Sequence, residues 1–443
     1  MERIAARWRE CGDDPSRARV IGDLFRSATT ALRARHGVPG DTPIDGASRA
    51  LYALGMGLGD GREYIFERAL RAALAEPRTS WTIDVLGSLA LQYPPAFEPA
   101  LACARDRPRG SSPRDIVLAK TSIEALARLV AAAPEATRVA LFEETMAAAR
   151  KSDYRPHDVP YLIATGAQRV GATAPDVVLA RVATVDPSYR ALAYALAAAH
   201  LPAAHRRRAI DEALAVPSLG DARPFVAMAD CLEPDHYPRA LELADALYSS
   251  PSCGATAVRA LVPGWAALGH VEDALARAGA IAHEPERQLA LALIAPHVSD
   301  LHARDQLVRR ATADLSGSAL ALAAPALVPL GYAAVLRDAG CGGSADALAG
   351  LAAAAVGPER ARFLAELSAK RDPLSMQPSL ARELAPEIVF PAWLRAFQHA
   401  CKAPALDEFF EDECGWGLTN WMSLVPLFGG ADAARQVADA VVP

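Results

Sequence analysis

The chain has 443 residues, a formal net charge of −6 at pH 7 and a pI of about 6.0. Hydrophobic residues make up 52% of it, enough to bury a core, which excludes wholesale disorder. The acidic balance argues against a dedicated nucleic-acid-binding protein, because such proteins need a basic face to neutralise phosphates.

Cysteine usage and the N-terminal segment indicate a cytoplasmic protein. The 7 cysteines are widely spaced and include no CxxC pair, so we expect reduced thiols rather than disulfides or structural zinc. Residues 1–11 are rich in charge and have no apolar core segment, so we expect no signal peptide. No uninterrupted apolar run is long enough to predict a membrane span.

Residues 1–200 are predicted to be an N-terminal helical-repeat region with eroded repeats. Segments 64–75 and 81–93 are predicted to form one helical hairpin, and 115–132 and 135–150 another, joined at Pro134. Residues 36–46 and 105–114 are rich in proline, glycine and polar residues, and are predicted to be loops.

Residues 201–385 are predicted to be regular helical-hairpin repeats. A series of prolines is spaced by 32, 29, 33 and 33 residues, and several of them end a similar Leu-Val-Pro or Ile-Ala-Pro phrase. A period of about 33–34 residues with two apolar segments predicts a helix–turn–helix unit, which buries its apolar face only when stacked on neighbours. The prolines of the series are Pro202, Pro234, Pro263, Pro296 and Pro329.

Local signals mark helix ends in this region. Gly269 is predicted to lie in a turn between two helices, and Pro285 and Pro358 in the first turn of helices, where proline costs no hydrogen bond. Asp300 and Ser344 can cap the helices that follow them, because their side-chain oxygens accept backbone N–H bonds.

Residues 386–443 are predicted to be aromatic and acidic capping helices. A helix is expected over 391–402, followed by the acidic segment 407–413. The last unit of a solenoid has no further neighbour, so its outer side needs a different composition.

The segment Gly269-His-Val-Glu-Asp-Ala-Leu-Ala-Arg-Ala278 resembles the second helix of a tetratricopeptide unit, entered through a glycine-containing turn. Residues 286–296 and 424–430 are similar to degenerate repeats in helical arrays of bacterial signalling proteins. The chain thus resembles degenerate tetratricopeptide- and HEAT-like helical-repeat proteins. This resemblance implies an all-α, right-handed α-solenoid of stacked antiparallel hairpins with a binding role.

Basic and aromatic clusters are the candidate partner-binding residues. Each has two interpretations: a solvated or capping surface, or a contact with an anion, a nucleic acid or a protein partner. The basic candidates lie on a predicted helix and on the loop 105–114, and the aromatic candidates lie in and after the acidic segment. They are Arg206, Arg207, Arg208, Arg107, Arg109, Phe409, Phe410 and Trp416.

No residue pattern predicts catalysis, a cofactor or a metal. The histidines His270, His283, His297 and His302 lack the spacing that places ligands on one helix face. The glycine-rich stretch 340–344 has no following lysine and is predicted to be an inter-helix turn, and Cys341 within it has no identifiable base. No P-loop is present.

Three functions remain open from the sequence. The first is a non-enzymatic scaffold or adaptor that binds a protein partner on the concave solenoid surface. The second is a nucleic-acid-binding repeat protein that uses the arginine clusters, against which the net charge argues. The third is an enzyme on a helical-repeat scaffold, with Asp84 near Trp81 or Glu413 near Trp416 as its carboxylate.

Overall fold

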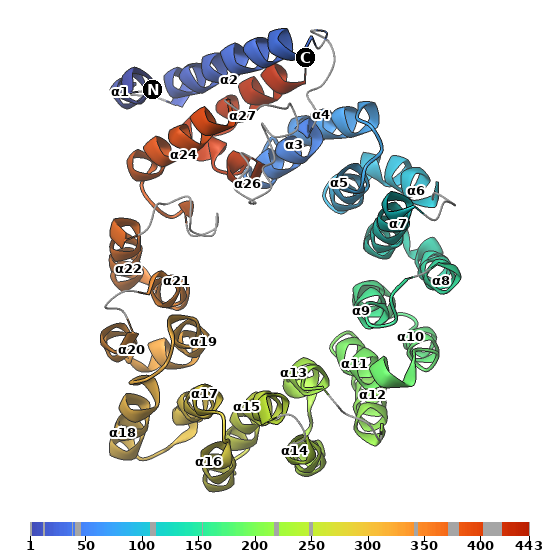
Figure 1. The fold of residues 1–443 in the computed structure, drawn as a ribbon, viewed down its shortest axis with the longest axis vertical. Coiled ribbons are helices and arrows are strands. Elements are labelled where there is room, and N and C mark those ends of the chain that lie inside the picture. Colours follow the sequence, from blue (N-terminus) through green and yellow to red (C-terminus); the bar gives the residue numbers. More distant parts are fainter. Residues whose placement is uncertain are drawn as a thin grey trace. The chain divides into compact units, whose positions relative to one another are not determined.

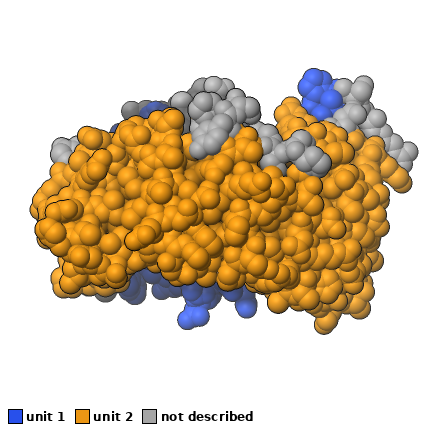
Figure 2. Space-filling view, turned by 90° about the horizontal axis from the view of Figure 1, so that it is seen from below, with its two compact units in different colours: residues 1–132, 371–443 blue, residues 133–370 orange. Residues whose placement is uncertain are grey.

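The computed structural model describes residues 2–442, except 12–13, 38, 40–45, 107–111, 153, 217–220, 248–250, 341–343, 371–380 and 402–418. These residues form α-helices and short 3-10 helices and contain no strand, so the predicted all-α class is confirmed. The chain divides into two compact units (Figures 1 and 2). Unit 1 comprises 1–132 and 371–443, and unit 2 comprises 133–370.

Unit 1 combines the first and last helices of the chain. Its helices are α1 (Glu2–Glu10), α2 (Asp14–His36), α3 (Ala47–Met56), α4 (Arg62–Ala75), α5 (Ser80–Ala90), η1 (Pro94–Ala96), α6 (Phe97–Arg105), α7 (Pro113–Ala132), α24 (Pro386–Ala400), α26 (Thr419–Met422), η7 (Val425–Phe428) and α27 (Gly430–Val441).

Unit 2 is a continuous stretch of helical hairpins. Its helices are α8 (Glu135–Lys151), α9 (Val159–Val170), α10 (Pro175–Val182), α11 (Pro187–Ala198), α12 (Ala203–Ala215), α13 (Arg223–Met228), η2 (Ala229–Cys231), η3 (Pro234–His236), α14 (Tyr237–Ala246), α15 (Pro251–Ala267), α16 (Val271–Ala280), α17 (Glu284–Ile294), η4 (Ala295–His297), α18 (Leu301–Thr312), α19 (Gly317–Leu327), η5 (Val328–Leu330), α20 (Ala333–Gly340), α21 (Ala345–Ala354) and α22 (Gly357–Lys370).

The hairpins of each unit stack in two rows. In unit 2, successive odd-numbered helices from α9 to α21 pack on one another and form the odd row. The even-numbered helices α8 to α22 form the even row, and Figure 2 shows unit 2 as a continuously packed surface. In unit 1, α3, α5 and α7 form an odd row, with α4 and α6 as the even row. Short connections join antiparallel neighbours, as the predicted solenoid-like array requires.

The predicted period holds over part of unit 2. The first residues of α15, α17 and α19, namely 251, 284 and 317, are 33 residues apart, whereas α13 begins 28 residues before α15 and α21 begins 28 residues after α19. The division into 1–200, 201–385 and 386–443 concerns the regularity of the repeats rather than compactness, and it stays a prediction.

Proline and capping residues explain why the helices begin where they do. Pro285 and Pro358 lie in the first turns of α17 and α22, as predicted. The Asp300 carboxylate accepts the backbone N–H groups of His302 and Ala303 at 2.8 and 3.0 Å. The Ser344 hydroxyl caps α21, also as predicted. These devices satisfy N–H groups that have no partner within the helix.

Small residues let neighbouring helices approach closely. A Cβ added to Gly350 of α21 would lie 2.4 Å from the Cα of Ala321 in α19. The core of unit 2 is made largely of alanine, leucine and valine. The low aromatic content therefore reflects narrow spacing between helices.

The aromatic residues concentrate instead where the two chain ends meet in unit 1. α2 packs along α27, and α1 contacts α24 (Figure 1). The buried cluster takes residues from both ends: Trp8, Phe25, Phe390, Trp393, Phe397 and Phe428. Within this unit the C-terminal helices therefore cover the N-terminal ones.

Candidate functional site

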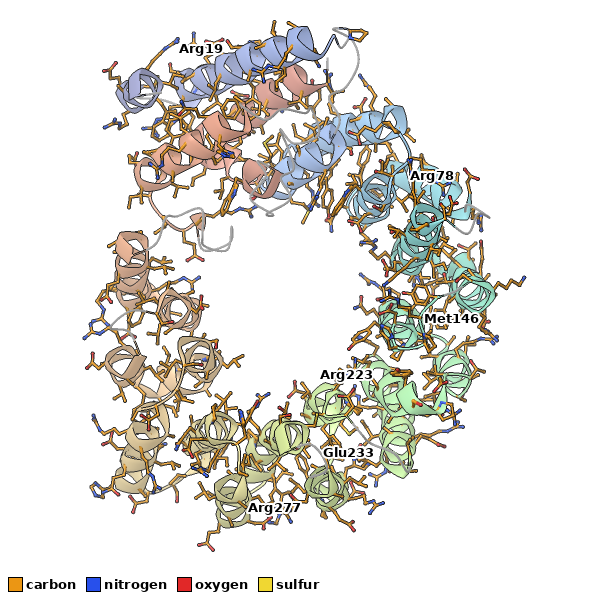
Figure 3. All side chains as sticks on the ribbon, viewed as in Figure 1. Arg19, Arg78, Met146, Arg223, Glu233 and Arg277 are labelled. Atoms are coloured by element: carbon orange, nitrogen blue, oxygen red, sulfur yellow. The ribbon has the colours of Figure 1, made fainter. Side chains whose placement is uncertain are left out.

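Ion pairs link consecutive helices of the even row in unit 2. Arg181 Nε of α10 donates to the Glu143 carboxylate of α8 at 2.8 Å. Arg277 Nη1 of α16 (labelled in Figure 3) lies 2.5 Å from Asp245 Oδ2 of α14. Arg337 of α20 lies 3.7 Å from Glu366 of α22. The helices of this row pack less closely on one another than those of the odd row, and long charged side chains connect them.

The predicted arginine run on α12 belongs to this network. Arg206 donates to the backbone carbonyl of Leu201 at 3.3 Å, and Arg208 lies 3.8 Å from Asp176 of α10. Arg207 forms ion pairs with both Glu233 and Asp235, and its hydrogen bond lowers the pKa of the Asp235 carboxyl. These charges are partnered within unit 2, so partner binding by this run stays a prediction.

The other candidate partner-binding residues lie outside the described residues. These are Arg107, Arg109, Phe409, Phe410 and Trp416.

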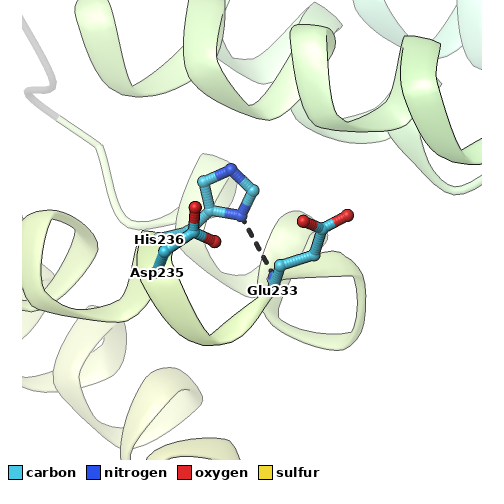
Figure 4. A group of neighbouring side chains, drawn as sticks. All are labelled: Glu233, Asp235 and His236. Carbon is cyan, nitrogen blue, oxygen red and sulfur yellow. Dashed lines mark hydrogen bonds between the residues drawn. The ribbon is translucent and has the colours of Figure 1, made fainter.

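Glu233, Asp235 and His236 form a cluster with metal-type donors at the start of α14 (Figure 4). The His236 side chain is buried, its Nδ1 accepts the Glu233 backbone N–H at 3.1 Å, and its Nε2 lies 3.2 Å from Asp211 Oδ1. Both ring nitrogens are therefore used, and both carboxylates already face the Arg207 guanidinium. A cation would have to displace this charge, so the cluster joins α12 to α14 and does not fit a metal centre.

The histidines singled out in the sequence have separate surroundings. His270 stacks on the Trp265 indole with ring centroids 3.6 Å apart. His302 Nε2 lies 2.7 Å from the Gln306 amide, and His283 lies at the N-terminal end of α17. Among the residues described, these histidines form no common ligand set.

The odd row of unit 1 presents an exposed aromatic site, here called the Trp81 cluster: Arg49, Trp81, Asp84 and Arg128. The Arg49 guanidinium of α3 lies 4.3 Å from the Trp81 ring centroid of α5. Asp84 Oδ1 of α5 lies 2.6 Å from Arg128 Nη2 of α7. Trp81 keeps 51% of its surface exposed. The cluster thus joins three consecutive odd-row helices while leaving an indole accessible.

Asp84 is the carboxylate that the sequence placed near Trp81 for the enzymatic alternative, and that role stays a prediction. Its charge is paired with the Arg128 guanidinium, which favours the ionised carboxylate. The other carboxylate considered for an enzymatic role, Glu413, lies outside the described residues.

Further exposed apolar side chains occur along the odd row of unit 2. They come from three different hairpins: Tyr161 of α9, Val226 of α13 and Leu322 of α19. Tryptophan, tyrosine and arginine dominate the binding energy of protein interfaces, because they combine large apolar area with polar atoms. The two odd rows thus carry residue types that suit protein recognition.

The stacked hairpins define a helical-repeat protein. No protein-family model matches the sequence, and no curated protein matches it. A structural comparison pairs it with a solved structure titled "Circular tandem repeat protein with novel repeat topology and enhanced subunit contact surfaces". The two are 13% identical, the match covers 97% of this chain and 95% of the other, and the TM-score is 0.17.

None of the helices in the described part of the chain has the length and apolar character needed to cross a membrane.

Proposed function

We propose that the chain is a non-enzymatic scaffold or adaptor that binds a protein partner on its odd-row surfaces. The observation that carries this proposal is the Trp81 cluster, where an indole stays 51% exposed although it is held by Arg49. An ordered, exposed tryptophan loses little conformational entropy on binding and buries a large area.

The placement of Gly269 supports a finer proposal, that the hairpins are degenerate tetratricopeptide- or HEAT-like repeats of the kind found in bacterial signalling proteins. Gly269 has a φ of 93° and lies in the turn between α15 and α16. This is the position that the resemblance assigns to it. A cytoplasmic location belongs to the same proposal.

The nucleic-acid alternative has less support. Arg207 and Arg208 face carboxylates, and phosphate binding would have to break these pairs. The predicted loop arginines Arg107 and Arg109 lie outside the described residues.

The test is affinity purification of the tagged chain from its own cells, compared with two variants. Trp81→Ala removes the exposed indole, and Leu74→Ala removes an exposed apolar side chain of α4, in the even row. We expect a stoichiometric protein that wild type and Leu74→Ala retain and Trp81→Ala loses. A preparation with nucleic acid and no protein would overturn the proposal, and so would a partner that Trp81→Ala retains fully.

A further inference from the structure

His236 is the only aspartate, glutamate, lysine, arginine or histidine that is buried in the described part of the chain, with 4% of its surface exposed. It ends η3 at the start of α14 (Figure 4), and its ring contacts α12 through Asp211. Histidine is the side chain whose charge changes between about pH 5 and pH 8. A buried histidine that links two helices can therefore make their junction sensitive to acid.

The hydrogen bonds of His236 require the neutral ring. The Glu233 backbone N–H, which can only donate, lies 3.1 Å from His236 Nδ1, so Nδ1 carries no proton. Nε2 then carries the proton of the neutral ring and donates to Asp211 Oδ1 at 3.2 Å. The Nδ1 bond is half of a capping box, because the Glu233 side chain accepts the backbone N–H of His236 in return. The neutral imidazole is thus part of the start of α14.

Carboxylates lie within reach of both ring nitrogens. Asp211 of α12 faces Nε2, and the donor atoms of Glu233, Asp235 and His236 all lie within 4.8 Å of one another. The Glu233 and Asp235 carboxylates both pair with the Arg207 guanidinium of α12. The neighbouring charges on α12 and α14 are engaged elsewhere: Arg208 lies 3.8 Å from Asp176, and Arg239 lies 2.8 Å from Glu242. A second ring N–H would therefore find an acceptor among the partners of Arg207.

We propose that His236 is an acid-sensitive switch at the junction of α12 and α14. In the imidazolium both ring nitrogens are donors. The new Nδ1–H faces the Glu233 N–H, and because two donors form no hydrogen bond, the cap bond breaks. The ring then turns Nδ1–H to the Glu233 or Asp235 carboxylate, and Arg207 loses one of its two partners. Acid thus loosens the start of α14 and the hold on Arg207 together.

The sign of the effect follows from the state that keeps the bond. The Glu233 N–H bond exists only with the neutral ring, so its contribution to stability is present at neutral pH and is lost as the pH falls. The switch lies in unit 2, whereas the Trp81 cluster lies in unit 1. It goes beyond the proposed scaffold function, and each proposal can fail without the other.

The test follows the ring and the cap in the full chain. NMR of the chain with isotope-labelled histidine identifies the tautomer and the charge of His236 between about pH 7.5 and about pH 5.5. Hydrogen exchange over the same range reports the amides of α14, as protection factors that remove the pH dependence of intrinsic exchange.

Two variants and a control separate the switch from other titrations. The amide oxygen of His236→Asn is bonded to Cγ, as Nδ1 is in histidine, so it accepts the Glu233 N–H but cannot be protonated. Asp211→Asn keeps the ring and removes the carboxylate that accepts its Nε2–H. His200→Gln, which changes a half-buried histidine of the same unit, is the matched control.

We expect the Nε2–H tautomer at about pH 7.5, and at about pH 5.5 the imidazolium with protection of α14 about tenfold lower. The loss should persist in His200→Gln, disappear in His236→Asn and shift to lower pH in Asp211→Asn. A ring that stays neutral, an imidazolium with unchanged protection, or an equal loss in His236→Asn each overturns the proposal. Should His236→Asn not fold, an unshifted loss in Asp211→Asn overturns it instead.

Discussion

The Trp8 indole Nε1 donates a 2.8 Å hydrogen bond to the backbone carbonyl of Phe428, 420 residues further along the chain. Phe390 stacks on the same indole with ring centroids 4.3 Å apart, and the Arg17 guanidinium lies 4.5 Å from it. A residue of the first helix is thus central to the core formed by the last helices. The stability of unit 1 therefore depends on both ends of the chain.

Trp8→Ala tests this dependence. The substitution leaves a cavity and an unpaired Phe428 carbonyl in a fully buried site, so we expect a loss of about 3–5 kcal/mol in the stability of unit 1. Hydrogen exchange should show lost protection in α2 and α27 and retained protection in α15. Trp8→Phe, which keeps an aromatic ring, should lose clearly less stability than Trp8→Ala. Unchanged exchange in α27 would contradict the prediction.

Two glycines of one hairpin should respond to substitution by alanine in opposite directions, one losing stability and the other gaining it. Gly269 has a φ of 93°, which L-residues adopt at a cost, so Gly269→Ala should lower the free energy of unfolding by about 1–2 kcal/mol. Gly279 lies within the helix α16, and a Cβ added there meets no atom within 4 Å. Gly279→Ala should therefore raise stability by about 0.5–1 kcal/mol. Urea denaturation of both variants checks the signs, and a stabilising Gly269→Ala would refute the strain argument.

Much of the helical arrangement follows from local signals in the sequence. α8 begins at residue 135 as predicted, and α16 and α18 begin directly after the predicted turn at Gly269 and the predicted cap Asp300. The hairpin of α4 and α5 was also predicted, and the two helices do pack together. Proline, glycine and capping residues act within one turn, so they can be interpreted without the fold.

The tertiary partners were not predicted, for two different reasons. The pairing of Trp8 with Phe428 leaves no periodic signal, because it joins unrelated segments at the two chain ends. The ion pairs of the even row do leave a periodic signal, because Asp245 and Arg277 are 32 residues apart, close to the repeat period. Opposite charges one repeat apart therefore indicate neighbouring helices, whereas the arginine run taken alone suggested a binding surface.

A charge swap tests the even-row ion pairs. Arg277 and Asp245 are partly exposed, so Arg277→Asp or Asp245→Arg alone should cost about 0.5–1 kcal/mol through like-charge repulsion and loss of the pair. The double variant should recover part of this cost. Urea denaturation at about 0.05 and 0.5 M salt measures both effects, and the differences should shrink at high salt. Strict additivity of the single changes would show that the two side chains do not interact.

His200 makes the stability of unit 2 depend on pH. The side chain is half-buried at the end of α11, and burial lowers its pKa below the ordinary value of 6.5. At this histidine the unfolded chain therefore binds a proton more readily than the folded chain. The contribution of neutral His200 to stability is fully present above pH 6.5 and is lost as the pH drops below that value. His200→Gln should reduce this fall between pH 7 and pH 5, as measured by urea midpoints. His302→Gln, which removes an exposed histidine, is the control, and an equal reduction in both variants would mean that burial of His200 is not the cause.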